Sequence, residues 1–303
     1  MAIIIEFDAY GPAEVLHPVQ VPDPVPGPGE VRIRVRAAGV QPFDCATRRG
    51  DYVQYTLLRF PARLGNEAAG IIDQAAGPGG LSEGDEVIAF MTMRGYADTV
   101  VVPATDAVLK PATMTWPEAG VLSASGQTAD TALDELAVGP RDTVLIHAAA
   151  GGVGSFAVQL ARARGAAVIG TASERNHDYL RSLGATPVSY GPGLQDRARA
   201  AAPHGIDAVL DAVGGEALDV SMKLVTDTAR IVTIADWTAP ARLGIRRIGT
   251  DRSAERLTRL TRLFDEGKLT IPVSATFPLE NAADAHRQVE TGHNRGKVAL
   301  TVG

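Results

Sequence analysis

Between Thr143 and Gly154 the chain reads TVLIHAAAGGVG, a short apolar strand followed by a glycine-rich turn and the start of a helix. Ala149, Gly151 and Gly154 have the GxGxxG spacing, with alanine in the first place. Small residues in such a turn let the backbone approach phosphates, and the N–H groups at a helix start bind an anion. A second strand ends about 20 residues later, as a nucleotide-binding unit requires. The sequence therefore predicts a dinucleotide site rather than an ordinary tight turn, formed by Ala150, Gly151, Gly152, Val153 and Gly154.

The segments around this turn alternate between strand and helix. From Trp116 onward, short apolar runs separate stretches in which apolar residues recur with helical spacing. The predicted strands are 144–147, 167–170, 208–210 and 230–234, and the predicted helices are 118–137, 155–164, 177–183, 216–224 and 251–267. Repeated strand–helix alternation indicates an α/β fold with a doubly wound parallel sheet.

The first hundred residues follow a different pattern. They are rich in glycine and proline, and residues 19–30 carry enough prolines to form an extended, irregular connection. Residues 31–37 alternate as VRIRVRA, the pattern of a strand with one solvated face, and short strands are predicted at 69–74, 86–90 and 99–102. Closely spaced short strands indicate a β-barrel or β-sandwich.

Composition excludes several classes of function. The 303 residues carry a net charge of −6, which argues against nucleic acid or an anionic membrane as the main partner. Cys45 is the single cysteine, so neither an internal disulfide nor a four-cysteine zinc site can form. No apolar run reaches the roughly 18 residues of a membrane span, and the first residues lack the features of a secretion signal. We therefore expect a cytoplasmic protein.

The end of the second strand of the nucleotide unit determines which coenzyme fits. Sites for NAD usually place an acidic residue there, whereas this chain has Ala172, which leaves space for a 2′-phosphate. Ser173 can donate a hydrogen bond to that phosphate and Arg175 can supply charge. These residues favour NADPH. The alternative is that Glu174 turns inward and favours NAD, with Arg175 an ordinary exposed arginine.

Short motifs recur along nearly the whole chain, at 29–31, 35–44, 49–50, 64–70, 84–87, 95–98, 125–129, 147–154, 211–215 and 296–300. In their order and spacing they resemble the medium-chain dehydrogenase/reductase superfamily, in its zinc-independent quinone oxidoreductase (zeta-crystallin-like) group. The resemblance implies a GroES-like β-barrel domain over 1–115, to which residues 266–303 return. It implies a Rossmann domain that binds NADPH over 116–265.

The resemblance also bears on metal binding. Zinc-dependent members of this superfamily have a cysteine and a histidine as ligands at the positions that are Gln41 and Asn66 here. Neutral carboxamides are poor zinc ligands compared with thiolate or imidazole. Cys45 lies four residues from Gln41 and is expected to be a small buried side chain. We expect no catalytic zinc.

Without a metal, hydrogen-bond donors must polarise the substrate carbonyl. The resemblance implies that Tyr52 acts as the carbonyl donor or proton source, while Gln41 and Asn66 orient the substrate or the nicotinamide ribose. Tyr55 is the alternative tyrosine, and Tyr52 could instead be an aromatic that only packs. Asp44 is expected to cap a helix rather than to act as a base.

Further coenzyme contacts are implied by the same resemblance. Thr128, Val213, Gly214, Ile234 and Ala235 would surround the nicotinamide, and Tyr190 would lie near the adenosine phosphate. Trp237 follows the carboxyl end of a strand, where doubly wound folds bind ligands. Trp237 and Tyr55 are candidates for the substrate pocket, with a core or interface position as the alternative for Trp237.

These expectations combine into one hypothesis: reduction by NADPH of an activated C=C bond in an enone or a quinone. A close variant is an enoyl-thioester or polyketide-intermediate reductase of specialised biosynthesis. A rival from another class is a zeta-crystallin-like protein that binds NADPH without catalysis. The resemblance suggests a homodimer, with neither nucleic acid nor a membrane as partner.

Overall fold

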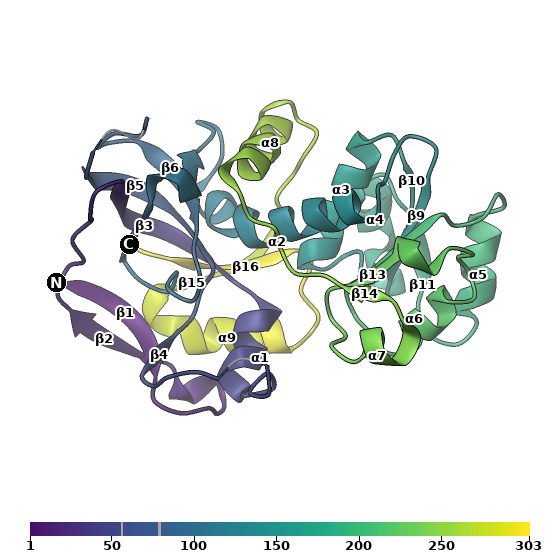
Figure 1. Cartoon of the computed structure of the whole chain (residues 1–303), viewed down its shortest axis with the longest axis horizontal. Helices are drawn as coiled ribbons and strands as arrows, with labels where there is room; N and C mark the ends of the chain where they lie inside the picture. The colour runs from purple at the N-terminus through teal and green to yellow at the C-terminus, as the bar shows by residue number, and fades with distance from the viewer. Residues whose placement is uncertain (56, 78–79) are drawn as a thin grey trace. The chain divides into compact units, whose positions relative to one another are not determined.

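The computed structural model describes residues 1–55, 57–77 and 80–303, which form two compact units. Unit 1 comprises Met1–Ala124, Arg252–Asp265 and Ile271–Gly303, and unit 2 comprises Ser125–Asp251 and Glu266–Thr270. Both marked chain ends belong to unit 1 (Figure 1). Within the described ranges, no helix is long and apolar enough to cross a membrane.

Unit 1 is built around two β-sheets. The smaller has the order β2-β1-β4, and the larger runs β15-β16-β3-β5-β6-β8, with β7 also paired to β3. The strands are β1 Ala2–Phe7, β2 His17–Val21, β3 Glu30–Val40, β4 Ala62–Arg63, β5 Glu67–Ala75, β6 Glu86–Phe90, β7 Thr99–Pro103, β8 Ala107–Leu109, β15 Val273–Pro278 and β16 Lys297–Thr301. Because β16 pairs antiparallel with β3, the end of the chain returns to the β unit, in agreement with the predicted fold.

Strand β3 shows why this sequence forms a sheet with one buried face. Val31, Ile33 and Val35 are buried, as the alternation predicts for every second residue. The intervening Arg32 and Arg34 bind Asp73 of β5, with Nε–O distances of 2.8 and 2.7 Å. The apolar face therefore joins the core while the arginines are neutralised by a cross-strand carboxylate.

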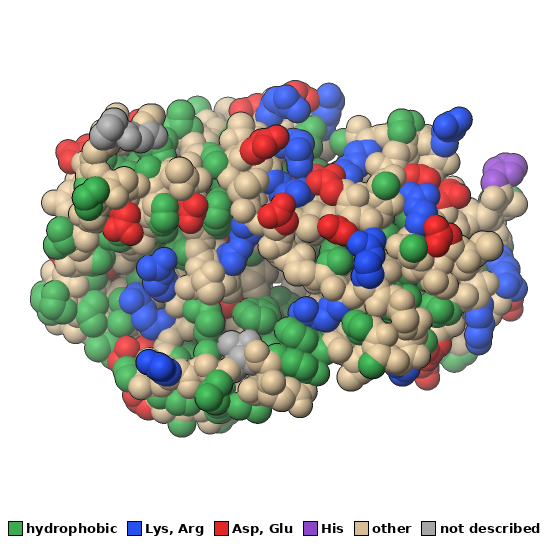
Figure 2. Space-filling view, in the orientation of Figure 1, with side chains coloured by type: hydrophobic (Ala, Val, Ile, Leu, Met, Phe, Trp, Pro, Cys, Tyr) green, Lys and Arg blue, Asp and Glu red, His purple; other side chains and the backbone are tan. Residues whose placement is uncertain are grey.

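Beside the first part of α2 (Trp116–Glu135), the described residues of unit 1 form three further α-helices. They are α1 Pro42–Arg49, α8 Ala254–Asp265 and α9 Ala282–Glu290. The buried residues of α8 are Leu257, Leu260 and Thr261, while Arg256 and Arg259 are half-buried and Arg262 is exposed. In Figure 2, basic side chains gather over α8 with acidic side chains among them.

Unit 2 contains a six-stranded, wholly parallel sheet with the order β11-β10-β9-β12-β13-β14. Its strands are β9 Thr143–Ile146, β10 Ala167–Ala172, β11 Thr186–Ser189, β12 Ala208–Asp211, β13 Ile231–Thr233 and β14 Arg246–Arg247. Its helices are the later part of α2 Trp116–Glu135, α3 Gly152–Ala163, α4 His177–Ser182, α5 Leu194–Ala201, α6 Glu216–Ser221 and α7 Ala239–Leu243 (Figure 1). In chain order this is 3-2-1-4-5-6, the Rossmann order, which confirms the predicted doubly wound sheet.

The structure adds elements that the sequence reading did not include and shifts others. Helices α5 and α7 were not predicted, α1 was anticipated only as a helix capped by Asp44, and the helix expected over 251–267 begins at Ala254. The compact units also differ from the predicted domain limits, because residues 116–124 and 252–265 lie in unit 1. A Cβ on Gly120 would lie 2.6 Å from that of Ala37, and Arg252 Nη1 donates to the carbonyl of Met91 at 2.5 Å. Such close contacts attach both segments to the β unit.

Candidate functional site

The predicted glycine turn lies between β9 and α3. Gly151 is the residue that precedes α3, and Ala148 has a positive φ of 52°, which alanine rarely adopts. A Cβ on Gly154 would lie 2.3 Å from the Ala148 carbonyl oxygen. The first turn of a helix leaves N–H groups without intrahelical acceptors. The turn therefore has the close packing and the anion-binding helix end that a dinucleotide pyrophosphate needs.

His147, just before this turn, is a buried structural residue. Its ring contacts two hydroxyl groups, with Nε2 2.8 Å from Ser221 Oγ and Nδ1 3.2 Å from Thr171 Oγ1. Burial lowers the pKa of His147 to about 4, against the attraction of Asp211. The neutral imidazole therefore anchors the residues just before the glycine turn to β10 on one side and to α6 on the other.

The residues proposed to select the coenzyme follow two neighbouring strands. Ala172 ends β10, is buried, and pairs with Ser189 at the end of β11. Ser173 and Tyr190 therefore follow paired positions at one sheet edge, and Tyr190 is 63% exposed. Glu174 and Arg175 are both exposed in the short 3-10 turn Glu174–Asn176. A carboxylate and a guanidinium are thus both exposed after the end of β10, where the coenzyme-selecting residues are predicted.

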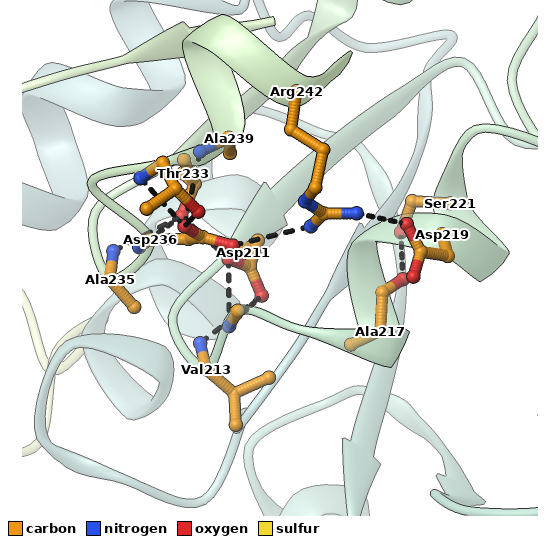
Figure 3. A network of polar contacts seen from close by, with 12 residues as sticks. Asp211, Val213, Ala217, Asp219, Ser221, Thr233, Ala235, Asp236, Ala239 and Arg242 are labelled. Atoms are coloured by element: carbon orange, nitrogen blue, oxygen red, sulfur yellow. Dashed lines mark hydrogen bonds and ion pairs between the residues drawn. The ribbon is translucent and has the colours of Figure 1, made fainter.

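Asp211, at the end of β12, fixes the loop that contains Val213 and Gly214 (Figure 3). The Asp211 carboxylate is fully buried and accepts the N–H groups of Val213 at 3.1 Å and Gly214 at 2.9 Å. It also accepts the hydroxyl of Thr233, at the end of β13, at 2.6 Å. One carboxylate therefore ties together the ends of two adjacent strands.

The loop after β13 is held through the same hydroxyl. Thr233 Oγ1 accepts the N–H groups of Ala235 and Asp236, each at 3.1 Å. Asp236 in turn accepts from Thr238, which lowers the pKa of Asp236 to about 2, and it forms an ion pair with Arg242 (Figure 3). The structure thus brings the predicted Val213–Gly214 and Ile234–Ala235 pairs to neighbouring loops.

The sequence reading gave no role to Asp211 or Thr233. The available signal was an aspartate at a strand end directly before Ala212, Val213, Gly214 and Gly215, because an aspartate there accepts N–H groups two and three residues later. The partner hydroxyl of Thr233 is 22 residues away and carries no such local signal.

Two other residues that were predicted to contact a ligand, Thr128 and Trp237, contact residues of unit 2 itself. Thr128, on α2, has its hydroxyl 2.5 Å from that of Thr250. The guanidinium of Arg247 lies 3.3 Å from the ring centroid of Trp237. The cation covers a face of the indole, so Trp237 presents a ring already stacked on an arginine.

In unit 1, Gln41 lies between β3 and α1 and its side chain is held at both ends. Its Nε2 donates to Glu67 Oε1, and its Oε1 accepts from Lys297 Nζ at 2.5 Å. Lys297 Nζ also lies 3.8 Å from Glu67 Oε1. All three residues are buried, and burial raises the pKa of Glu67 to about 6 and lowers the pKa of Lys297.

Asp44 connects Gln41 to Asn66. One carboxylate oxygen accepts the Gln41 backbone N–H at 2.9 Å, which caps α1 as predicted, and the Tyr96 hydroxyl at 3.1 Å. The other accepts from Asn66 Nδ2 at 3.0 Å. Burial raises the pKa of Asp44 to about 6. The structure therefore brings Gln41 and Asn66 together through one buried carboxyl group.

Tyr52 also contacts the start of α1, through its aromatic ring. Its ring stacks on Phe43 of α1, with centroids 5.5 Å apart and planes 22° apart. Tyr55, the alternative tyrosine, is 46% exposed, and its backbone N–H donates to the Tyr52 carbonyl at 2.8 Å. The stacking shows that Tyr52 packs, and its catalytic role remains a prediction.

Cys45 is buried on α1, and burial raises the pKa of its thiol, so it is unsuited to act as a nucleophile. Across the residues that the structure describes, no three His, Cys, Asp or Glu side chains lie close enough together to hold a metal ion.

Comparison with known proteins identifies the family. Residues 27–112 match the alcohol dehydrogenase GroES-like domain, and residues 183–300 match the zinc-binding dehydrogenase family. The chain is 35% identical to the pikromycin polyketide synthase component PikAII of Streptomyces venezuelae. That match covers 97% of this chain but only 8% of the relative, so the chain spans a small part of that protein.

Solved structures match over the whole chain. The quinone oxidoreductase from Coxiella burnetii is 32% identical, covers 100% of both chains and has a TM-score of 0.89. The Escherichia coli quinone oxidoreductase complexed with NADPH is 25% identical, covers 99% of both chains and has a TM-score of 0.87. The chain belongs to the medium-chain dehydrogenase/reductase superfamily, with quinone oxidoreductases among its full-length relatives.

Proposed function

We propose that this protein is a zinc-independent, NADPH-dependent reductase of an activated C=C bond in an enone or a quinone. The observation that carries the proposal is the turn between β9 and α3, where a Cβ on residue 154 would lie 2.3 Å from the Ala148 carbonyl oxygen, closer than side chains normally approach. A relative of the same fold is an NADPH complex, which supports the same coenzyme here.

The coenzyme would be held at the carboxyl edge of the unit 2 sheet. The glycine turn fits the pyrophosphate, and Ser173, Arg175 and Tyr190 fit a phosphorylated adenosine. Two loops tied by Asp211 would surround the nicotinamide. When bound, NADPH supplies a hydride.

Unit 1 would hold the substrate carbonyl. We propose that Tyr52 donates a hydrogen bond to that oxygen or provides the proton, while Gln41 and Asn66 orient the substrate or the ribose. The buried network fixes the orientation of both amides before substrate arrives, because Lys297, Glu67 and Asp44 hold their polar atoms. Preorganised donors of this kind stabilise developing negative charge on an enolate oxygen.

Zinc independence is supported by charge as well as by ligand type. The Lys297 ammonium is bonded to Gln41 Oε1, so the position that zinc-dependent relatives give to a ligand already faces a cation. A divalent ion there would meet a neutral amide and a positive neighbour. Elemental analysis of the purified chain should find no stoichiometric zinc, and a chelator should not reduce turnover. Loss of turnover with the chelator would overturn this part of the proposal.

A second candidate is the reduction of an enoyl thioester, such as a polyketide intermediate. The specific observation in its favour is the 35% identity to a component of a polyketide synthase. The cytoplasmic location and the homodimer stay predictions.

The decisive assay follows NADPH absorbance with quinones, simple enones and enoyl thioesters as acceptors. Consumption with enones or quinones supports the first candidate, and consumption restricted to thioesters supports the second. Tight binding of NADPH without consumption for any acceptor would contradict both and favour a protein that only binds the coenzyme.

A further inference from the structure

Unit 1 contains a cavity that the proposed reaction does not use. It has a volume of about 170 Å³ and lies among residues of β1, β2, β4 and β7. Arg63 and Arg94 line it together with Ile4, Val21 and Val100. Gln41, Asn66 and Tyr52 are not among its lining residues.

The backbone fixes both arginines at this cavity. Arg63 belongs to β4, which pairs with β1 through Glu6. The backbone N–H of Arg94 donates to the carbonyl of Gly65, two residues beyond Arg63, at 2.9 Å. The two guanidinium groups are therefore carried by segments that are hydrogen-bonded to each other, and their proximity does not depend on a mobile loop.

The charges at the cavity are incompletely balanced. Arg63 Nε is buried without a hydrogen-bond partner, and among the described residues no carboxylate forms an ion pair with Arg63 or Arg94. Burial lowers the pKa of Arg63, the charge of Glu6 raises it, and the charge of Arg94 lowers it by a smaller amount. A third cation nearby, Arg34, already forms ion pairs with Asp73 at 2.7 Å and with Asp23 at 3.6 Å. Two neighbouring cations, one of them desolvated, are costly unless an anion joins them.

We propose that this cavity binds a small carboxylate with a short aliphatic tail. The planar guanidinium groups of Arg63 and Arg94 suit the two oxygens of a carboxylate. The apolar side chains of Ile4, Val21 and Val100 would contact the tail, which an inorganic anion lacks.

The volume limits the ligand. A water molecule takes about 30 Å³ in the liquid, so the cavity has room for the equivalent of about six waters. Pockets for larger organic ligands usually measure about 300–1,000 Å³. A dinucleotide or a long acyl chain is therefore too large, and the inference is independent of the proposed coenzyme and substrate.

The test is a calorimetric titration of the full chain with butyrate, with inorganic phosphate and butyramide as comparison probes. Butyrate should bind with a Kd of about 1 mM or below, phosphate more weakly, and neutral butyramide not at all. Arg63→Gln and Arg94→Gln should each weaken butyrate binding by about tenfold. Arg59→Gln, an exposed arginine of unit 1 that does not line the cavity, should leave it unchanged.

Circular dichroism checks that each variant is folded, and Arg94→Gln changes an exposed residue, so it keeps the test valid if Arg63→Gln unfolds. Absence of butyrate binding in the wild type would overturn the proposal. Unchanged binding in the folded arginine variants would do so as well, and binding of phosphate in preference to butyrate would contradict the carboxylate assignment.

Discussion

Arg175 and Glu174 follow β10 side by side, and both are exposed. Their opposite charges act on a 2′-phosphate in opposite senses, so coenzyme preference depends on which of them faces the ribose. We propose that Arg175, together with Ser173, occupies that position.

Replacing Arg175 with Ala should weaken NADPH binding by about tenfold and leave NADH binding nearly unchanged, because only NADPH carries the phosphate that the guanidinium binds. Arg181→Ala is the matched control, since Arg181 is also exposed and lies six residues further along, in α4. Binding curves for both coenzymes provide the measurement. An equal loss for NADPH and NADH would remove Arg175 from phosphate recognition.

His147 carries a prediction about pH. In the unfolded chain its pKa is near 6.5, and burial lowers it to about 4 in the folded protein. Neutral His147 therefore makes its full contribution to the free energy of unfolding above pH 6.5. This contribution decreases as the pH falls towards 4, by up to about 3 kcal/mol. His147→Asn should be less stable at pH 7 and should lose less stability than the wild type between pH 6.5 and 4.

Urea unfolding at several pH values measures this difference. The exposed His204 is the control, and His204→Asn should keep the wild-type pH dependence. The buried carboxyls of Asp44 and Glu67 have raised pKa values and act in the opposite sense, but they are the same in all three proteins. If the free energy of unfolding of His147→Asn depends on pH as that of the wild type does, the buried imidazole does not cause this pH dependence.

At the scale of the elements, two features set the turns at the carboxyl edge of the unit 2 sheet. Gly154 is one, and the pair Asp211–Thr233 is the other. Each fixes a loop at the end of a strand, where a doubly wound sheet binds its ligand.

Gly154→Ala should destabilise the protein by about 1–3 kcal/mol and weaken coenzyme binding. Helix propensity alone would favour alanine by about 1 kcal/mol. However, the new Cβ would meet the Ala148 carbonyl oxygen at 2.3 Å, so the turn must shift. A Cβ on Gly249 would meet no atom within 4 Å, so Gly249→Ala should change neither the stability nor the coenzyme binding. Thermal unfolding and NADPH titration of both variants decide the matter, and a more stable Gly154→Ala with full affinity would contradict the packing argument.

Thr233→Val keeps the shape of the side chain but removes the hydroxyl that joins Asp211 to the N–H groups of Ala235 and Asp236. We expect a loss of about 1–3 kcal/mol in stability, because a buried carboxylate loses a donor, and weaker coenzyme binding. Thr233→Ser should restore both. Thr226→Val, at an exposed position of the same unit, should have no effect. A full-affinity Thr233→Val would show that the network does not position the loops.

At the scale of the whole molecule, the sequence predicted what depends on local patterns. The alternation in β3 and the strand–turn–helix at the glycine turn are periodic features, and the parallel sheet follows from repeated β–α units. Helix α1 was missed because it is short and mostly polar, although Asp44 was recognised as its cap.

Contacts between distant residues could not be predicted in this way. Lys297 and Gln41 are 256 positions apart, and no local pattern indicates that an ammonium holds that amide. The pairing of Arg63 with Arg94 in one cavity likewise depends on strand pairing rather than on spacing. Candidate site residues could thus be named from motifs, whereas the network that orients them required the structure.

The central claim is that a phosphorylated dinucleotide binds at the turn between β9 and α3. Titration of the intact chain with NADPH, followed by nicotinamide fluorescence, tests it most directly. We expect saturable binding that is tighter for NADPH than for NADH and is reduced in Gly154→Ala. If neither coenzyme binds to the folded wild-type protein, the proposed function is wrong.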